Sequence, residues 1–149
     1  MLQGRRRWWA GKVGDFAGTA HLFPTHPTVL ATIRSFLRGQ ATRAGLAEQT
    51  TDDVVLAVSE ACANSLRHTV SPHIKLTWRL LPYAVEVDVE DGGVFRSGAA
   101  AADAEGASTG GGTGILLMAA LTDEIVIRQG TEDQPGTLVR LVKYLPAPP

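Results

Sequence analysis

The sequence predicts an α+β fold in which helices cover one face of a mixed, mostly antiparallel sheet. Three observations lead to this prediction. Two segments with apolar residues at helical spacing come first, paired runs of alternating apolar and polar residues follow, and one short apolar helix lies between the later runs. Such a two-layer sandwich leaves the other face of the sheet open to solvent or to a partner.

Length and composition limit the possible classes of protein. The chain has 149 residues, the size of one domain, and its 14 basic and 15 acidic side chains give no charge excess that would hold nucleic acid or a membrane surface. The single cysteine, Cys62, excludes an internal disulfide and fits a reducing compartment. No apolar run is long enough to cross a bilayer. We therefore expect a cytoplasmic protein, with a flexible basic segment at residues 1–16 and a tail at residues 146–149.

Two helices are predicted after an edge strand at residues 19–23. The segment from Pro27 to Gly45 has a proline suited to a first helical turn and a glycine suited to a left-handed C-terminal cap. The second helix is predicted from about Thr51 to His68, because its apolar residues fall on one arc. We expect this arc to face the core; it consists of Val54, Val55, Val58, Ala61, Cys62, Ser65 and Leu66.

The rest of the chain predicts two hairpins and a short helix. Residues 74–80 and 84–90 alternate in polarity around a turn at residues 81–83. A mobile loop is predicted at about residues 96–112, where alanine, glycine, serine and threonine predominate, and a helix is predicted after Gly114. The segments 124–128 and 137–145 then predict two more strands around the turn at residues 131–136.

The second predicted helix carries polar residues beside its apolar arc. Glu60, Asn64 and His68 are spaced by four, so they lie on one side of the helix. A carboxamide oxygen can bind Mg²⁺, and a carboxylate one turn away can orient or deprotonate an attacking hydroxyl. Taken alone, this spacing is more often just the solvated face of a helix.

Two glycine-rich segments add further candidates. Asp91 is followed by Gly92 and Gly93, so a carboxylate meets backbone that lets a planar ligand approach, although an ordinary turn would look the same. The segment from Gly110 to Gly114 leads into a helix whose free N–H groups could bind phosphates, or it is a hinge without a ligand. The absence of a following lysine or acidic residue argues against a P-loop and a Rossmann turn.

The order of these elements resembles the GHKL (Bergerat) ATP-binding fold, and is most similar to the anti-sigma-factor serine kinases and related ATP-binding regulators. The resemblance rests on SEACANSLRH in a helix, VEDGG at a strand end, the glycine-rich helix start, and Gly136-Thr137 at the opening of the last strand. It spans roughly residues 23–145. It implies one ATP-binding domain at residues 17–145 with a lid at about residues 96–112.

The resemblance also implies a role for each matching residue. Glu60 would be the catalytic general base for the hydroxyl that is phosphorylated, Asn64 would coordinate Mg²⁺, and Asp91 would bond the amino group of adenine. The remaining nucleotide-binding residues would support the pocket, contact adenine through water or belong to the lid and the phosphate-facing helix start: His68, Gly93, Gly110, Gly111, Gly112, Thr113, Gly114, Ile115 and Thr137.

Two positions depart from the family pattern. Phe95 stands where the family often has a further glycine, and Thr113 stands where related proteins often have arginine. Either change would weaken or reshape phosphate binding. Phe95 could instead pack under the adenine or hold the first turn of the lid.

Three functions remain open from the sequence. The first is a serine/threonine protein kinase that uses ATP and Mg²⁺, sequesters a sigma factor and phosphorylates an anti-anti-sigma protein of the STAS type. The second is a nucleotide-binding partner-switching module with little or no transfer, and the third is an interaction domain without nucleotide. The resemblance implies a homodimer, and we expect no direct contact with nucleic acid or membrane. A sensor histidine kinase is not favoured, because no upstream helix carries a phosphoacceptor histidine.

Overall fold

The computed structural model describes residues 18–92, 94–95, 111–131 and 133–146. The elements run in the order β1 (Thr19–Pro24), α2 (Val29–Arg43), α3 (Glu48–His68), β2 (Thr69–Val70), β3 (His73–Leu81), β4 (Ala84–Asp91), β5 (Val94–Phe95), α5 (Gly111–Leu121), β6 (Glu124–Gln129) and β7 (Thr137–Tyr144). The predicted N-terminal segment, most of the predicted lid and the end of the tail lie outside the described residues.

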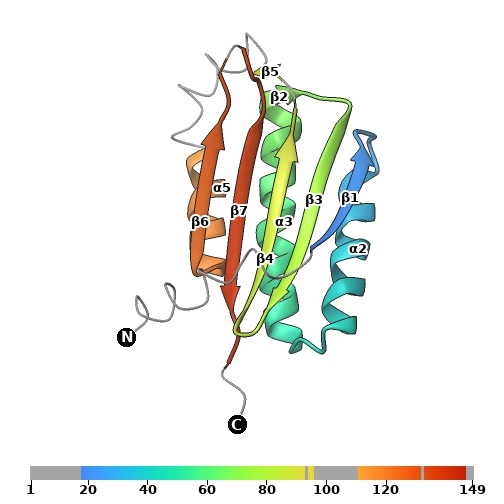
Figure 1. Cartoon of the computed structure of the whole chain (residues 1–149), viewed down its shortest axis with the longest axis vertical. Helices are drawn as coiled ribbons and strands as arrows, with labels where there is room; N and C mark the ends of the chain where they lie inside the picture. Colours follow the sequence, from blue (N-terminus) through green and yellow to red (C-terminus); the bar gives the residue numbers. More distant parts are fainter. Residues whose placement is uncertain (1–17, 93, 96–110, 132, 147–149) are drawn as a thin grey trace.

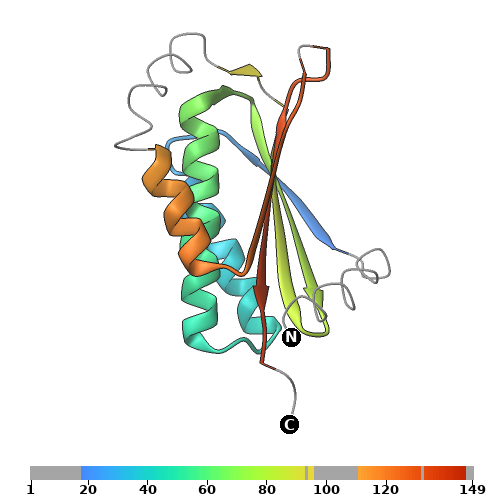
Figure 2. The same ribbon diagram turned by 90° about the vertical axis from the view of Figure 1, so that its left-hand side faces the viewer.

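The predicted two-layer architecture is confirmed. Five strands form one sheet in the order β1-β3-β4-β7-β6, and all of its pairs are antiparallel. The short strands β2 and β5 pair separately. Figures 1 and 2 show α2, α3 and α5 together on one face of the large sheet. No helix in the described ranges is both long and apolar enough to cross a membrane.

Two helices begin earlier than the sequence pattern predicted. The helix α3 begins at Glu48 rather than near Thr51, whose hydroxyl instead donates to the Ala47 carbonyl within the first turn. The helix α5 begins at Gly111 and not after Gly114, so three glycines lie in its first turn. Glycine has a low helix propensity, but contacts with neighbouring elements routinely outweigh propensity. The predicted cap at Gly45 is confirmed by its φ of 69°.

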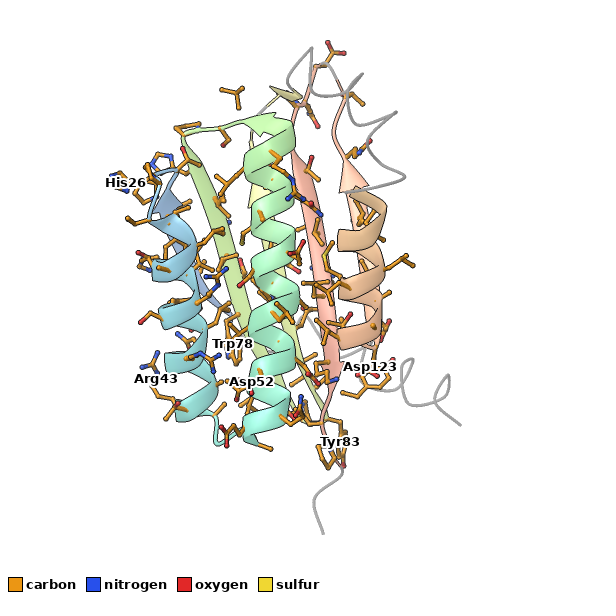
Figure 3. All side chains as sticks on the ribbon, turned by 180° about the vertical axis from the view of Figure 1, so that it is seen from behind. His26, Arg43, Asp52, Trp78, Tyr83 and Asp123 are labelled. Carbon is orange, nitrogen blue, oxygen red and sulfur yellow. The ribbon has the colours of Figure 1, made fainter. Side chains whose placement is uncertain are left out.

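The core lies between the helices and the sheet. Alternate residues of β3 and β4 point toward the helices, and Figure 3 shows Trp78 between α2 and α3. Five residues of the predicted α3 arc are buried there, and so is Ala57, which the pattern had not included. Burial raises the pKa of the Cys62 thiol to about 12, so this thiol packs as an apolar group. The central buried residues include Ile33, Leu37, Val58, Ile74, Leu76, Val87, Met118 and Leu141.

The opposite face of the sheet carries a network of buried charges. Arg79 on β3 donates to Glu86 at 3.1 Å and to Asp88 at 2.9 Å, and Arg140 on β7 donates to Asp88 through two bonds of 2.7 and 2.9 Å. Both carboxylates are almost fully buried, with 2% and 3% of their residue surfaces exposed. These ion pairs join the three central strands of the sheet.

The two carboxylates of this network respond to burial in opposite ways. Burial alone would raise the pKa of Asp88, but hydrogen bonds from Arg140 and Arg79 lower it below its ordinary value. For Glu86, burial outweighs the attraction of the arginines, so its pKa is raised. The arginines therefore stabilise the charged form of Asp88 more than that of Glu86.

Candidate functional site

Glu60 and Asn64 both reach the first turn of α5. A Cβ atom built on Gly114 would lie 3.1 Å from Glu60 Oε2 and 3.3 Å from Asn64 Nδ2. Any residue larger than glycine at position 114 would push aside the side chain of Glu60 or Asn64. The helix start and the two polar residues that the sequence had singled out are therefore brought together.

A cavity of about 110 Å³ lies between α3, α5 and the sheet. Sites for drug-sized ligands have volumes of about 300–1,000 Å³, so this space suits a single ring system rather than a complete nucleotide. Four residues that the sequence proposed for the site lie along its wall: Asn64, Asp91, Ile115 and Thr137. The remaining walls are Ala61, Ser65, Val89, Met118, Ile127, Gln129 and Val139.

The polar wall of the cavity is a row across three strands. Asp91 on β4 pairs with Thr137 on β7, and Thr137 pairs with Gln129 on β6. Directly opposed side chains in an antiparallel pair lie about 5 Å apart on the same face of the sheet. The row begins beside Gly136, where φ is 137° and a Cβ would lie 2.8 Å from the Asp91 carbonyl oxygen. Glycine at this position lets β7 approach the end of β4.

Thr137 provides a direct test of whether a polar ligand fits the cavity. Its Oγ1 is buried and has no hydrogen-bond partner among the residues that the structure describes. A buried hydroxyl without a partner costs about 1–3 kcal/mol, and such groups are rare in native structures. An adenine with its ordered water would give this hydroxyl a partner. The residues present therefore fit the base that the sequence resemblance implies.

Two neighbours of Asn64 contribute contacts that the sequence analysis did not anticipate. The Ser65 hydroxyl donates to Asp91 Oδ2 at 2.5 Å, although the apolar pattern assigned Ser65 to the core arc. The Arg67 guanidinium donates through Nη2 to Asn64 Oδ1, the oxygen proposed as a metal ligand. Neither contact has a signal in the sequence, because each depends on where a side chain turns in the folded structure.

Several predicted residues are described only in part. Gly111, Gly112 and Thr113 lie in the first turn of α5, and His68 is the last residue of α3. The side chains of Thr113 and His68 lie outside the described part. Gly93 and Gly110 are also outside it. The backbone at Phe95 pairs with Thr69 in the small β2–β5 sheet, so this position is tied to the end of α3.

The site has few groups that could hold a metal ion. Among the described residues there is no cluster of three or more histidine, cysteine, aspartate or glutamate side chains that could do so. Mg²⁺ is commonly bound through one or two protein oxygens together with substrate phosphates and water. Asn64 offers one amide oxygen for that mode of binding, but this oxygen accepts from the Arg67 guanidinium, which would have to move aside for a cation. A cation held wholly by protein would require more ligands.

Known proteins match the chain along most of its length. The model of the histidine kinase-like ATPase domain matches residues 23–143. The serine-protein kinase RsbW of Bacillus pumilus is 30% identical over 137 residues, covering 82% of each chain. RsbW of Bacillus subtilis is 28% identical over 135 residues, with the same coverage.

Solved structures show the same fold at low sequence identity. The structure of the RsbU and RsbW domains of a Mycobacterium tuberculosis protein matches with a TM-score of 0.66 and 20% identity, over 87% of this chain and 33% of that one. The present chain thus spans about a third of that longer protein. A chain of the SiaB–SiaC complex from Pseudomonas aeruginosa matches with a TM-score of 0.63 and 12% identity, over 95% of this chain and 96% of that one.

The fold is that of a GHKL-type ATP-binding domain. This chain belongs to the histidine kinase-like ATPase family, in the branch that includes the RsbW serine-protein kinases.

Proposed function

We propose that this domain is an anti-sigma factor with protein serine kinase activity, which binds ATP and Mg²⁺ and phosphorylates an anti-anti-sigma protein of the STAS type. The main support is the convergence of Asn64, Asp91 and Thr137 on one cavity, next to the start of α5. The names of its relatives support the choice of a serine as phosphate acceptor.

Adenine would occupy the cavity along the polar row. The Asp91 carboxylate would accept a hydrogen bond from the exocyclic amino group, and the Thr137 hydroxyl would bond a ring nitrogen through water. Ile115 and Met118 from α5 supply apolar walls for the faces of the ring. This arrangement follows the usual composition of ligand sites, in which a few polar groups in an apolar cavity fix the orientation.

The phosphates would then extend toward the first turn of α5. Its free N–H groups and positive dipole end attract negative charge. Thr113 brings no charge, but Arg67 lies against Asn64 and supplies a cation at this end of α3. Mg²⁺, when bound at Asn64, would neutralise charge on the phosphate oxygens.

Glu60 would serve as the base for the transfer step. A serine hydroxyl of the partner attacks the γ-phosphorus, and its proton passes to the Glu60 carboxylate. The bond from the γ-phosphorus to the β–γ bridging oxygen breaks, and ADP leaves. Because the phosphoryl group itself carries most of the reaction, positioning and charge stabilisation are the main tasks of the protein.

The test is phosphoryl transfer to a recombinant STAS-type protein from the same genome, with γ-labelled ATP and Mg²⁺. We expect label on a serine of that protein, and we expect Glu60→Gln to lower the transfer rate by about 100-fold or more, as for loss of a general base. The matched control is Glu48→Gln at the exposed start of the same helix, which should leave the rate unchanged.

The alternative is a partner-switching module that binds nucleotide without transferring phosphate. Thr113 favours it, since the first turn of α5 has threonine where related proteins often have arginine. ATP binding together with partner release, but with no labelled serine in the wild type, would favour this module over the kinase. Labelling that is equal in wild type and Glu60→Gln would exclude Glu60 as the base.

A further inference from the structure

The contact between Ser65 and Asp91 joins α3 to the end of β4. The Ser65 hydroxyl donates to Asp91 Oδ2 at 2.5 Å, across a sequence separation of 26 residues. Ser65 is half-buried and Asp91 is 8% exposed, and both line the cavity. Contacts with an ionised carboxylate are shorter and stronger than those between neutral groups.

The two neighbouring residues Asn64 and Ser65 serve opposite ends of the site. Successive residues of a helix point about 100° apart. Asn64 reaches the first turn of α5 at Gly114, whereas Ser65 reaches the last residue of β4. One turn of α3 therefore contacts both the phosphate-facing helix start and the adenine-facing carboxylate.

We propose that Ser65 is a positioning residue for adenine recognition, which holds the Asp91 carboxylate in the orientation that accepts the exocyclic amino group. This inference rests on the proposed nucleotide function. A carboxylate offers about four acceptor sites, so it can bond the serine and an amino group together. The serine bond fixes the rotation of the carboxylate before the ligand arrives, which reduces the ordering cost of binding.

A direct consequence is that Ser65 acts on one chemical group of the ligand. Its removal should weaken binding only of purines that carry the exocyclic amine. A residue that merely filled space or stabilised α3 would change the affinity for every nucleotide alike. The pair of ATP and purine riboside triphosphate, which differ only in that amine, distinguishes the two roles.

The experiment is calorimetric titration of wild type, Ser65→Ala and Asp91→Asn with each of these two nucleotides in the presence of Mg²⁺. We expect Ser65→Ala to weaken ATP binding roughly three- to tenfold, the range of one net hydrogen bond, and to leave the affinity for purine riboside triphosphate unchanged. Asp91→Asn should act in the same direction. The double variant should lose less than the product of the single effects, because both residues act on one contact.

The matched control is Ser59→Ala on the same helix. Its hydroxyl is buried and donates to the Val55 carbonyl at 2.7 Å, away from the cavity lining, so both affinities should stay at the wild-type level. Equal weakening of both nucleotides by Ser65→Ala, or no weakening of either, would overturn the inference while the nucleotide site remained. A wild type that binds neither nucleotide would remove the proposed function itself.

Discussion

Two aspartates of the same strand lie on opposite faces of the sheet and have different surroundings. Asp88 faces away from the helices, is 3% exposed and receives hydrogen bonds from Arg79 and Arg140. Asp91 faces the helices at the end of β4 and receives the hydroxyl of Ser65 in the wall of the cavity. Because successive strand residues alternate between faces, one strand can carry a structural charge network on one face and the proposed nucleotide site on the other.

This comparison predicts that stability and nucleotide binding can be changed separately. Loss of the Asp88 charge on the open face should lower the free energy of unfolding and leave ATP affinity intact. Substitutions at the cavity should weaken ATP binding without lowering the free energy of unfolding.

The largest effect is expected for Asp88→Asn. Loss of this charge leaves two arginines beside a buried neutral group, and breaking a buried ion pair costs about 3–5 kcal/mol. Since Arg79 and Arg140 are 22% and 32% exposed in their side chains, we expect about 3 kcal/mol or less in urea unfolding at neutral pH. ATP affinity of the folded variant should equal that of the wild type; a parallel loss of affinity would contradict the separation of the two faces.

The pH dependence of this loss follows from the lowered pKa of Asp88. The stability that its charge contributes is present above the ordinary pKa of about 3.9 and is lost as pH falls through the lower value in the folded state. Urea midpoints of wild type and Asp88→Asn should therefore converge on acidification. Midpoints that stay equally far apart down to the acid limit of folding would show that the charge is not the cause.

A smaller effect is expected for Gly114→Ala, measured as ATP affinity. The added methyl group would lie 3.1 Å from Glu60 Oε2 and 3.3 Å from Asn64 Nδ2, which is closer than ordinary van der Waals contact, so these side chains must give way. We expect roughly tenfold weaker binding, about 1.4 kcal/mol. The matched control is Gly39→Ala in α2, where the nearest atoms are 3.7 Å away at the end of Arg43; it should raise stability by up to about 1 kcal/mol and leave binding unchanged. Equal ATP affinities for Gly114→Ala and Gly39→Ala would contradict a role for the contact between Gly114 and α3 in binding.

A further prediction concerns the buried hydroxyl of Thr137. Thr137→Val keeps the shape and removes an oxygen that bonds to none of the described residues, so the free energy of unfolding should stay the same or rise by about 1 kcal/mol. ATP affinity should fall about fivefold, near 1 kcal/mol, because the water-mediated contact is lost. A variant that is less stable and binds normally would show that the hydroxyl has a structural role instead.

The smallest effect is expected for Glu86→Gln. Burial raises the pKa of Glu86, so its stabilising contribution is complete below the ordinary pKa of about 4.3 and is lost as pH rises through the folded value. The neutral amide avoids this cost and keeps its hydrogen-bonding capacity toward Arg79. Thermal unfolding at neutral pH should therefore place this variant within about 0.5 kcal/mol of the wild type, or above it. A loss as large as that of Asp88→Asn would be inconsistent with the opposite pKa directions.

The sequence predicted the fold and singled out Asp91 and Thr137, but it predicted neither the row that they form with Gln129 nor the contacts around it. Periodicity identified the helices and both hairpins, because their apolar faces pack on one core. Asp91 was noticed by its place before two glycines, and Thr137 was proposed only through the family resemblance. The bond from Ser65 to Asp91 was missed, because it depends on how α3 packs on β4 and not on either local pattern.

The remaining misses also have long-range causes. The sequence placed the start of α5 after Gly114, because glycine disfavours a helix. The helix begins at Gly111 instead, where its first turn gains contacts with α3. Glu86 and Asp88 resembled the solvated residues of an alternating strand, and only the placement of Arg79 and Arg140 makes them a buried network. In each case the deciding partner lies on another element.

The most direct test of the central claim is calorimetric titration with ATP and Mg²⁺ of the wild type, Asp91→Asn and Asp88→Asn. We expect saturable binding near micromolar, about −8 kcal/mol, which Asp91→Asn weakens at least tenfold and Asp88→Asn leaves unchanged. No saturable binding up to about millimolar ATP, near −4 kcal/mol, or equal affinities for the wild type and Asp91→Asn, would contradict a nucleotide site in this cavity.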